Sequence, residues 1–156
     1  MATADAYWDT YLVDSNILLR IPRWNDPADA YVDGAVAALR KSGAVLYFTH
    51  QNIAEFWNVA TRPVMANGLG LSPQETRREV RSIERAMVLL PDGPTVYAAW
   101  RDLVATHSVS GRQVHDARLV AAMMVHGVTH LLTLNTADFE RYPEITPIHP
   151  RSVRPG

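Results

Sequence analysis

The chain has 156 residues, 47% of them hydrophobic and 20% charged, which is typical of one globular domain and excludes a disordered or fibrous chain. The absence of cysteine excludes disulfide frameworks, zinc ribbons, iron–sulfur clusters and thiolate nucleophiles. The formal net charge is −1, so no protein-wide positive field attracts a nucleic acid, which would have to be bound by local groups or by a metal.

Strand-like and helix-like segments alternate along the chain. In the first half we predict a strand at Tyr11–Val13, a helix from about Asp29 to Lys41, a strand at Val45–Phe48 and a helix from about Gln51 to Thr61. In the second half we predict a helix after the capping box Ser72–Glu75, a strand at Val88–Leu90, a helix ending near His107, a helix from about Val114 to His126, and strands at Leu131–Leu134 and Ile145–Ile148. Pro147 indicates that the last strand lies at a sheet edge.

This alternation predicts an α/β fold in which residues 1–156 form a single domain. Parallel strands need a crossover connection, which is usually helical, so the expected sheet is parallel and covered by helices on both faces. Ligands of such sheets bind at the carboxyl ends of the strands, near the point where the strand order reverses. Chemistry is therefore expected at that edge.

Nothing in the sequence indicates a membrane or secreted protein. The longest apolar run, Leu119–Val125, has seven residues, whereas a membrane-spanning helix needs about 20. The segment Met1–Asp5 has neither the basic start nor the apolar stretch of a secretion signal. We predict a soluble, cytoplasmic protein with no membrane partner.

Four carboxylates are expected at the carboxyl end of the sheet. Asp14 follows the first strand, Glu55 lies in the helix after the second, Asp116 starts the last long helix and Asp138 follows the fourth strand. Bringing anions together is unfavourable unless a cation or a proton relieves the repulsion, so the cluster predicts a divalent metal site. Oxygen ligands alone favour Mg²⁺ or Mn²⁺ over zinc, and these ions suit phosphate-ester chemistry.

Each of these carboxylates also has a structural interpretation. Asp116 and Asp138 are compatible with acidic residues that merely favour a helix N-terminus. Asp14 is compatible with a turn-forming role. Glu55 lies off the apolar stripe of its helix, which predicts a solvated face; the stripe is Ile53, Phe56, Trp57 and Ala60.

Four sequence blocks resemble the motifs of PIN-domain ribonucleases, the family that includes the VapC toxins of bacterial toxin–antitoxin pairs. The opening block is Tyr11–Leu18 and the second is Gln51–Trp57; the third and strongest is Gly111–Ala121, followed by His130–Phe139. The resemblance covers roughly Tyr11 to Ile148. It implies a PIN-like three-layer fold with a central, mostly parallel five-stranded sheet flanked by helices, whose core spans about residues 11–148.

The resemblance also implies roles for individual residues. The metal-binding acids of the family map onto the same four carboxylates, and its polar pair before the last acid maps onto Thr133 and Asn135. Many members carry an aspartate where this chain has Asn135, so one anionic ligand is absent. We expect Ser15, Asn16, Thr133 and Asn135 to hold the carboxylates or their waters in place. Independently of the resemblance, Arg112 and Arg118 flank Asp116 in the sequence and are placed to meet a phosphate or the acid of an inhibitor.

The implied activity is divalent-metal-dependent endoribonuclease cleavage, with RNA as substrate and Mg²⁺ or Mn²⁺ as cofactor. Similarity to VapC toxins implies a homodimer and a small antitoxin partner. A housekeeping RNA-processing nuclease and a non-catalytic PIN-like module that binds RNA or protein stay open as alternatives. A phosphoaspartyl enzyme or receiver domain is disfavoured, because the one lysine, Lys41, ends the first long helix and cannot reach the site.

Three tryptophans are weaker candidates for contact with bases. Trp57 and Trp100 lie at apolar helical spacings, which predicts core or subunit contacts. Trp24 lies in a loop and is the most open of the three. His50 and His115 adjoin the expected site, where structural roles are favoured over proton transfer.

Overall fold

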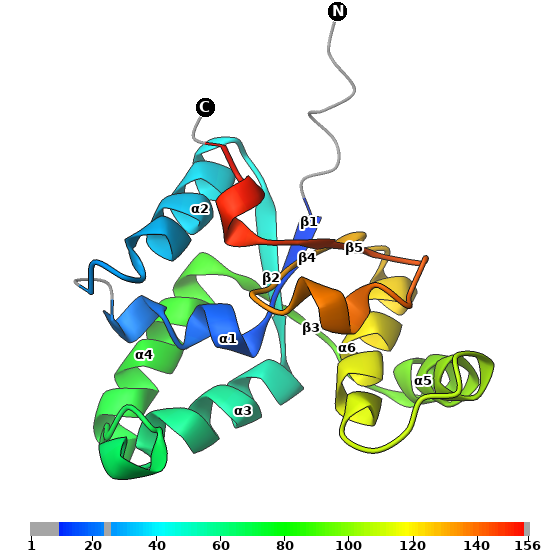
Figure 1. Ribbon diagram of the computed structural model, residues 1–156, viewed down its shortest axis with the longest axis horizontal. Coiled ribbons are helices and arrows are strands. Elements are labelled where there is room, and N and C mark those ends of the chain that lie inside the picture. The colour runs from blue at the N-terminus through cyan, green and yellow to red at the C-terminus, as the bar shows by residue number, and fades with distance from the viewer. Residues whose placement is uncertain (1–9, 24–25, 155–156) are drawn as a thin grey trace, which may run out of the picture.

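The computed structural model describes residues 10–23 and 26–154. Five strands make up its sheet: β1 (Thr10–Val13), β2 (Val45–Thr49), β3 (Val88–Leu90), β4 (His130–Leu132) and β5 (Thr146–Ile148). The α-helices are α1 (Ser15–Leu18), α2 (Ala30–Lys41), α3 (His50–Thr61), α4 (Pro73–Ala86), α5 (Pro94–Thr106) and α6 (Gln113–His126). Short 3₁₀ helices complete the described chain: η2 (Ile21–Arg23), η3 (Val64–Ala66), η4 (Thr136–Phe139) and η5 (Pro150–Ser152). Figure 1 shows their arrangement.

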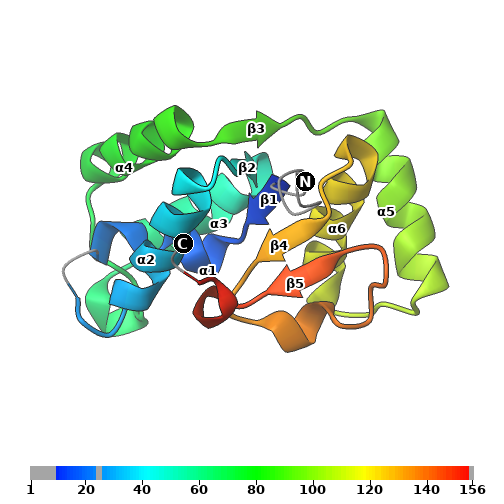
Figure 2. The same ribbon diagram turned by 90° about the horizontal axis from the view of Figure 1, so that it is seen from above.

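The sheet has the order β3-β2-β1-β4-β5, and every neighbouring pair is parallel. From β1 the chain builds outward through β2 to β3, then crosses back and builds the other half through β4 to β5 (Figure 2). The strand order therefore reverses between β1 and β4. In open α/β sheets, the crevice at the carboxyl ends of such strands is the usual ligand site. Pro147 lies in the edge strand β5, as its missing N–H predicts.

Helices cover both faces of the sheet, which confirms the three-layer α/β fold. Side chains of successive strand residues point to opposite faces, and Leu12 and Val13 of β1 contribute to different core clusters. One cluster joins the sheet to α1, α2, α3 and α4, including the fully buried Phe56. The other joins it to α5, α6 and η4, including Met123 and Phe139. Figures 1 and 2 show these helices on the two sides of the strands.

Local signals in the sequence explain where the long helices begin and end. Ser72 and Glu75 form a reciprocal capping box at the start of α4, with proline in its first turn. At the other end of a helix, Gly127 adopts φ 70° and closes α6, a left-handed conformation that glycine adopts without a Cβ clash. The predicted start of α4 and both predicted limits of α6 therefore match the structure to within one residue.

The capping box gives a first testable prediction. Ser72 Oγ accepts from Glu75 N at 3.1 Å, and Glu75 Oε1 accepts from Ser72 N at 3.1 Å. We expect Ser72→Ala to lower the free energy of unfolding by about 1 kcal/mol, as loss of a helix cap typically does. Ser82→Ala, at an exposed serine of the same helix, is the matched control and should have a smaller effect in urea denaturation. Equal losses in both variants would contradict the role of the cap.

Two details of the chain differ from the sequence-based expectation. The fourth strand ends at Leu132 rather than Leu134, because the Leu134 N–H donates to Asn16 Oδ1 at 3.2 Å instead of continuing the ladder. The short helix α1, which follows β1 directly, was not predicted. Trp24, the loop tryptophan, lies outside the described residues.

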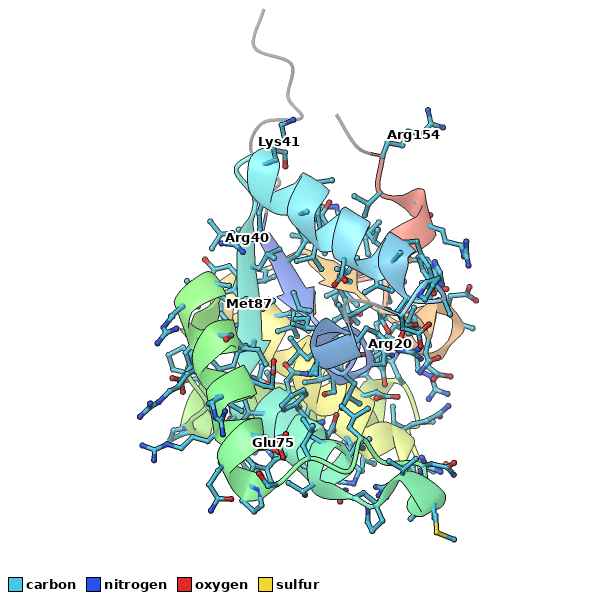
Figure 3. All side chains as sticks on the ribbon, turned by 90° about the vertical axis from the view of Figure 1, so that its left-hand side faces the viewer. Arg20, Arg40, Lys41, Glu75, Met87 and Arg154 are labelled. Atoms are coloured by element: carbon cyan, nitrogen blue, oxygen red, sulfur yellow. The ribbon has the colours of Figure 1, made fainter. Side chains whose placement is uncertain are left out.

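The outer surface of the layer formed by α2 and α4 carries charged side chains of both signs. Figure 3 shows Arg40 and Lys41 at the end of α2, while Glu75 lies near the start of α4. Met87, which follows α4, is buried, whereas Arg40 and Lys41 are exposed.

In the part of the chain that the structure describes, every helix falls short of the length and apolar character needed to cross a bilayer.

Candidate functional site

Asp14 lies where the strand order reverses. It follows β1 directly, and its side chain caps α1, with Oδ1 accepting from Ser15 N at 2.7 Å. Its Oδ2 accepts from Thr133 Oγ1 at 2.8 Å, beyond the end of β4. Asp14 is buried, with 8% of its surface exposed. The carboxylate is therefore fixed from two neighbouring strands.

Thr133 connects the ends of β1 and β4. Its side chain is fully buried, and Oγ1 also accepts from Asn135 N at 3.1 Å and from Asn16 Nδ2 at 3.3 Å. Asn16 Oδ1 in turn accepts from Leu134 N. The predicted polar residues Asn16, Thr133 and Asn135 thus form one hydrogen-bonded network beside Asp14. The Thr133 side chain orients the Asp14 carboxylate, whereas Asn135 joins the network through its backbone N–H.

Glu55 extends this network from α3. Its Oε2 accepts from Ser15 Oγ at 2.7 Å, and its Oε1 accepts from Gln51 Nε2 at 2.9 Å. Ser15 Oγ also accepts from Asn52 Nδ2 at 3.2 Å. The Glu55 side chain is partly buried and hydrogen-bonded, which differs from the alternative interpretation of Glu55 as a residue of a solvated helix face.

Asp116 and Asp138 approach the same site from α6 and η4. Within residues 10–23 and 26–154, neither carboxylate accepts a hydrogen bond. Burial, followed by the negative charges of Asp14, Asp138 and Glu55, raises the pKa of Asp116 to about 6. The other three predicted carboxylates therefore all act electrostatically on Asp116.

The pKa of Asp14, a buried residue, is raised in the same way. Burial raises the pKa of Asp14 to about 6, against the opposing hydrogen bonds from Thr133 and Ser15. The charges of Glu55 and Asp138 raise it further. Two carboxyl groups whose ionisation is disfavoured at one sheet end are typical of a functional site.

The donor chemistry of this cluster fits Mg²⁺ or Mn²⁺, which prefer carboxylate oxygens. Among the described residues, no three acidic or histidine side chains lie close enough together to form a complete ligand set. Binding an ion would therefore require side chains to rotate. Asp116 and Asp138 carry no hydrogen bonds that oppose such a rotation in this part of the chain, whereas Asp14 and Glu55 are already held.

Two side chains at the site were not among the predicted site residues. Gln51 Nε2 donates to Glu55 and also to the carbonyl oxygen of His115 at 2.9 Å, which joins α3 to α6. Asn52 is fully buried and holds Ser15. The four-residue spacing of Gln51 and Glu55 on one helix face is the signal that could have identified the first.

Arg112 is not brought against the carboxylates. It is exposed at the start of α6, and within the described ranges its side chain makes no ion pair or hydrogen bond. Arg118, two residues beyond Asp116 in α6, donates from Nη2 to Asp92 Oδ2. Arg118 also lines a cavity together with Glu55, whereas Arg112 is exposed at the start of α6.

Comparison with known proteins identifies the fold and the family. The family model described as PIN domain matches residues 11–145, most of the chain. This chain belongs to the PIN-domain family. No sequence among the curated proteins matches it. The match spans all four carboxylates, β1 from Tyr11 onward and the whole of β2, β3 and β4, whereas β5 follows directly after it.

Solved structures of low sequence identity share the fold of this PIN domain. A chain of VapBC2 from Rickettsia felis, bound to a DNA fragment from its promoter, aligns with TM-score 0.69 and 11% identity, covering 90% of this chain and 98% of that one. VapBC-1 from nontypeable Haemophilus influenzae gives TM-score 0.62 and 16% identity, covering 92% and 99%. A toxin–antitoxin complex from Klebsiella pneumoniae gives 0.61 and 16%, covering 90% and 97%.

The raised pKa values predict how the stability of the metal-free PIN domain depends on pH. Asp14 and Asp116 have ordinary values of 3.8 and bind protons more tightly when folded, with pKa values of about 6. The folded state therefore binds more protons between about pH 4 and 6, so these two groups make stability fall as the pH rises through that window. The charge partners of Asp116 include His115 as well as the other carboxylates.

The measurement is the melting temperature in EDTA across this pH range, for the wild type and the double variant Asp14→Asn/Asp116→Asn. Other carboxyl groups contribute equally to both proteins, so the difference between the two isolates the pair. We expect the wild type to gain stability relative to the double variant as the pH falls from 7 to 4. A difference independent of pH would contradict the assignment of raised pKa values.

Proposed function

We propose that this PIN domain is a divalent-metal-dependent endoribonuclease that hydrolyses RNA phosphodiester bonds. The proposal is carried by Asp14 and Glu55, which hydrogen bonds from Thr133 and Ser15 hold at the point where strand order reverses, and by their negative charges, which together with that of Asp138 raise the pKa of Asp116. PIN domains are generally nucleases that use divalent metal ions, so membership of the family supports the same activity. We further propose that the whole chain, residues 1–156, is one such domain.

The proposed mechanism assigns a task to each side chain. Asp14, Asp116 and Asp138 would hold the Mg²⁺ or Mn²⁺ ion, and Glu55 would complete the site or orient the attacking water. A divalent ion supplies a water of lowered pKa and offsets negative charge on the phosphate. Thr133, Asn16 and Asn135 keep Asp14 in place, and Ser15 does so for Glu55.

The two exposed arginines have a role in binding the substrate. Arg112 and Arg118 lie at the start of α6 and would contact RNA phosphates, because a guanidinium matches phosphate geometry with paired hydrogen bonds. Such contacts position the strand without reading its sequence. For Arg112 we propose contact with an RNA phosphate and no part in holding the metal ion.

We propose that the protein is the toxin of a toxin–antitoxin pair. The shared fold with chains from VapBC structures supports this role. It implies a small antitoxin that blocks the cleft, a homodimer, and a cytoplasmic location in which both the antitoxin and RNA are encountered. Expression of the chain alone and together with the protein encoded next to its gene would test the pairing, because only a toxin is neutralised by its neighbour.

A cleavage assay tests the enzymatic proposal. Purified protein is incubated with structured and with single-stranded RNA in Mg²⁺, in Mn²⁺ or in EDTA. We expect cleavage with either ion and none in EDTA. A non-catalytic RNA-binding module would leave every RNA intact, and a housekeeping nuclease would cut without being neutralised by a neighbouring protein.

A further inference from the structure

A second feature of the molecule adjoins the carboxylate cluster. A cavity of about 670 Å³ opens between α5 and α6, a size within the usual range of small-ligand sites. Figures 1 and 2 both show these two helices side by side. The side chains lining the cavity include Val96, Tyr97, Trp100, Val114, His115 and Arg118.

Two aromatic rings form part of this wall. Tyr97 is 60% exposed, and the guanidinium carbon of Arg101 lies 6.0 Å from the centroid of its ring. Its centroid lies 6.2 Å from that of Trp100, with the planes inclined by 37°. Trp100 Nε1 donates to the Val114 carbonyl at 2.8 Å, so the indole is fixed in place. Trp100, for which we predicted core or subunit contacts, is half-buried against the core, and its ring also lines this cavity.

The aromatic cavity neighbours a second cavity that reaches the candidate cleavage site. His115 and Arg118 line both the aromatic cavity and this second one of about 360 Å³, which Gln51 and Glu55 also line. A strand with a phosphate beside Glu55 would therefore pass His115 and Arg118 before it reached the aromatic wall.

Arg118 and Asp92 are the two charged residues with opposite signs that line the aromatic cavity. Arg118 is paired with Asp92, and the two side chains are 47% and 39% exposed. A pair this exposed contributes little stability, so Arg118 can exchange Asp92 for a phosphate oxygen at low cost.

We propose that the cavity between α5 and α6 binds a nucleobase of the RNA strand next to the scissile phosphate, stacked against Tyr97 and Trp100. The inference rests on the proposed function and names a substrate contact for it. Every base presents a flat π face to an aromatic ring, so such a site binds single-stranded RNA with little sequence preference. Tyr97 and Trp100 are then substrate-binding residues, and Arg118 binds the adjoining phosphate.

The test uses single-stranded RNA octamers in which each base in turn is removed while the ribose and phosphate stay. Binding is measured by fluorescence anisotropy with the Asp116→Asn protein, with and without the added change Tyr97→Ala, and the RNA is checked to be uncut. We expect removal of one particular base to weaken binding about tenfold when Tyr97 is present. The same removal should have almost no effect in the Tyr97→Ala protein.

Two matched variants complete the experiment. Tyr97→Phe keeps the ring and should restore the base dependence, and Met124→Ala, at an exposed apolar residue of α6 outside the cavity, should leave it unchanged. A base dependence that survives Tyr97→Ala overturns the proposal. The proposal is also overturned if Tyr97→Ala converts a dimer to a monomer in sedimentation and leaves RNA binding unchanged. A second copy of the chain would then occupy the cavity.

A competition measurement on the wild-type protein tests the proposal without relying on the folding of any variant. Adenosine and uridine 5′-monophosphates should compete with the RNA octamer at lower concentration than ribose 5-phosphate, and equal competition overturns the proposal. Failure of the proposed function is a separate result. If RNA binds through its bases but is never cut, the proposed nuclease activity is wrong and the proposed base-binding cavity stands. If RNA is cut and Tyr97→Ala has no effect on base-dependent binding, the proposed cavity is wrong and the proposed activity stands.

Discussion

Asp116→Asn should abolish RNA cleavage while making the metal-free protein more stable. The substitution keeps the shape of the side chain and removes one of the charges that would hold the cation. Metal ions supply several kcal/mol of stabilisation to phosphoryl transition states. A loss of about 4 kcal/mol corresponds to a roughly thousandfold slower reaction.

The stability change distinguishes this account from simple unfolding. The pKa of Asp116 is raised to about 6, so its ionised carboxylate destabilises the folded state at neutral pH. Removing that charge in EDTA should raise the melting temperature at pH 7. Asp102→Asn, at an exposed aspartate of α5 with 72% of its side chain exposed, is the control and should change neither quantity. A folded Asp116→Asn protein that cuts at the wild-type rate would place the site elsewhere.

Thr133→Val should have the second largest effect, acting through Asp14. The hydroxyl donates to Asp14 Oδ2 at 2.8 Å and accepts from Asn16 and Asn135. Valine has nearly the same shape and leaves these buried partners without a hydroxyl, which typically lowers stability by about 1–3 kcal/mol. It also removes the bond that lowers the pKa of Asp14, so protons compete more strongly with a cation.

The measurement is Mn²⁺ affinity by calorimetry, together with the cleavage rate. We expect a loss of about 10- to 100-fold in affinity, as is typical when a residue that orients a metal ligand is changed. Thr133→Ser keeps the hydroxyl and should retain most of the affinity. Equal loss in the serine and valine variants would mean that packing of the methyl group, rather than the hydrogen bond, matters at this position.

The parts of the site that could be predicted are those encoded in local sequence. Asp14 directly follows a short apolar strand, and Asp116 opens a helix whose apolar spacing and glycine stop are clear. The parallel sheet then follows from alternating strands and helices, and its reversal point brings Asp14 close to the end of β4. Once the sheet topology is predicted, the positions of these acidic residues at the carboxyl ends of the strands follow from it.

The remaining parts depend on contacts between distant residues. Asn16 and Thr133 are 117 positions apart, and their hydrogen bond belongs to the network that ends β4 early. Gln51 joins Glu55 to the backbone of α6, 64 positions away. Trp100 has the spacing of a core residue, and only the packing of α5 on α6 leaves its ring beside a cavity. No local pattern carries this information.

Calorimetric titration of Mn²⁺ into the wild-type protein at pH 6, in two buffers with different heats of ionisation, tests most directly whether the four carboxylates bind a cation. Asp14 and Asp116 have pKa values of about 6, so binding at that pH should displace protons, and the measured heat should differ between the buffers. We expect saturable binding with proton release, and neither in the Asp14→Asn/Asp116→Asn variant. Absence of binding in the wild type, or equal binding by the folded double variant, would contradict the account.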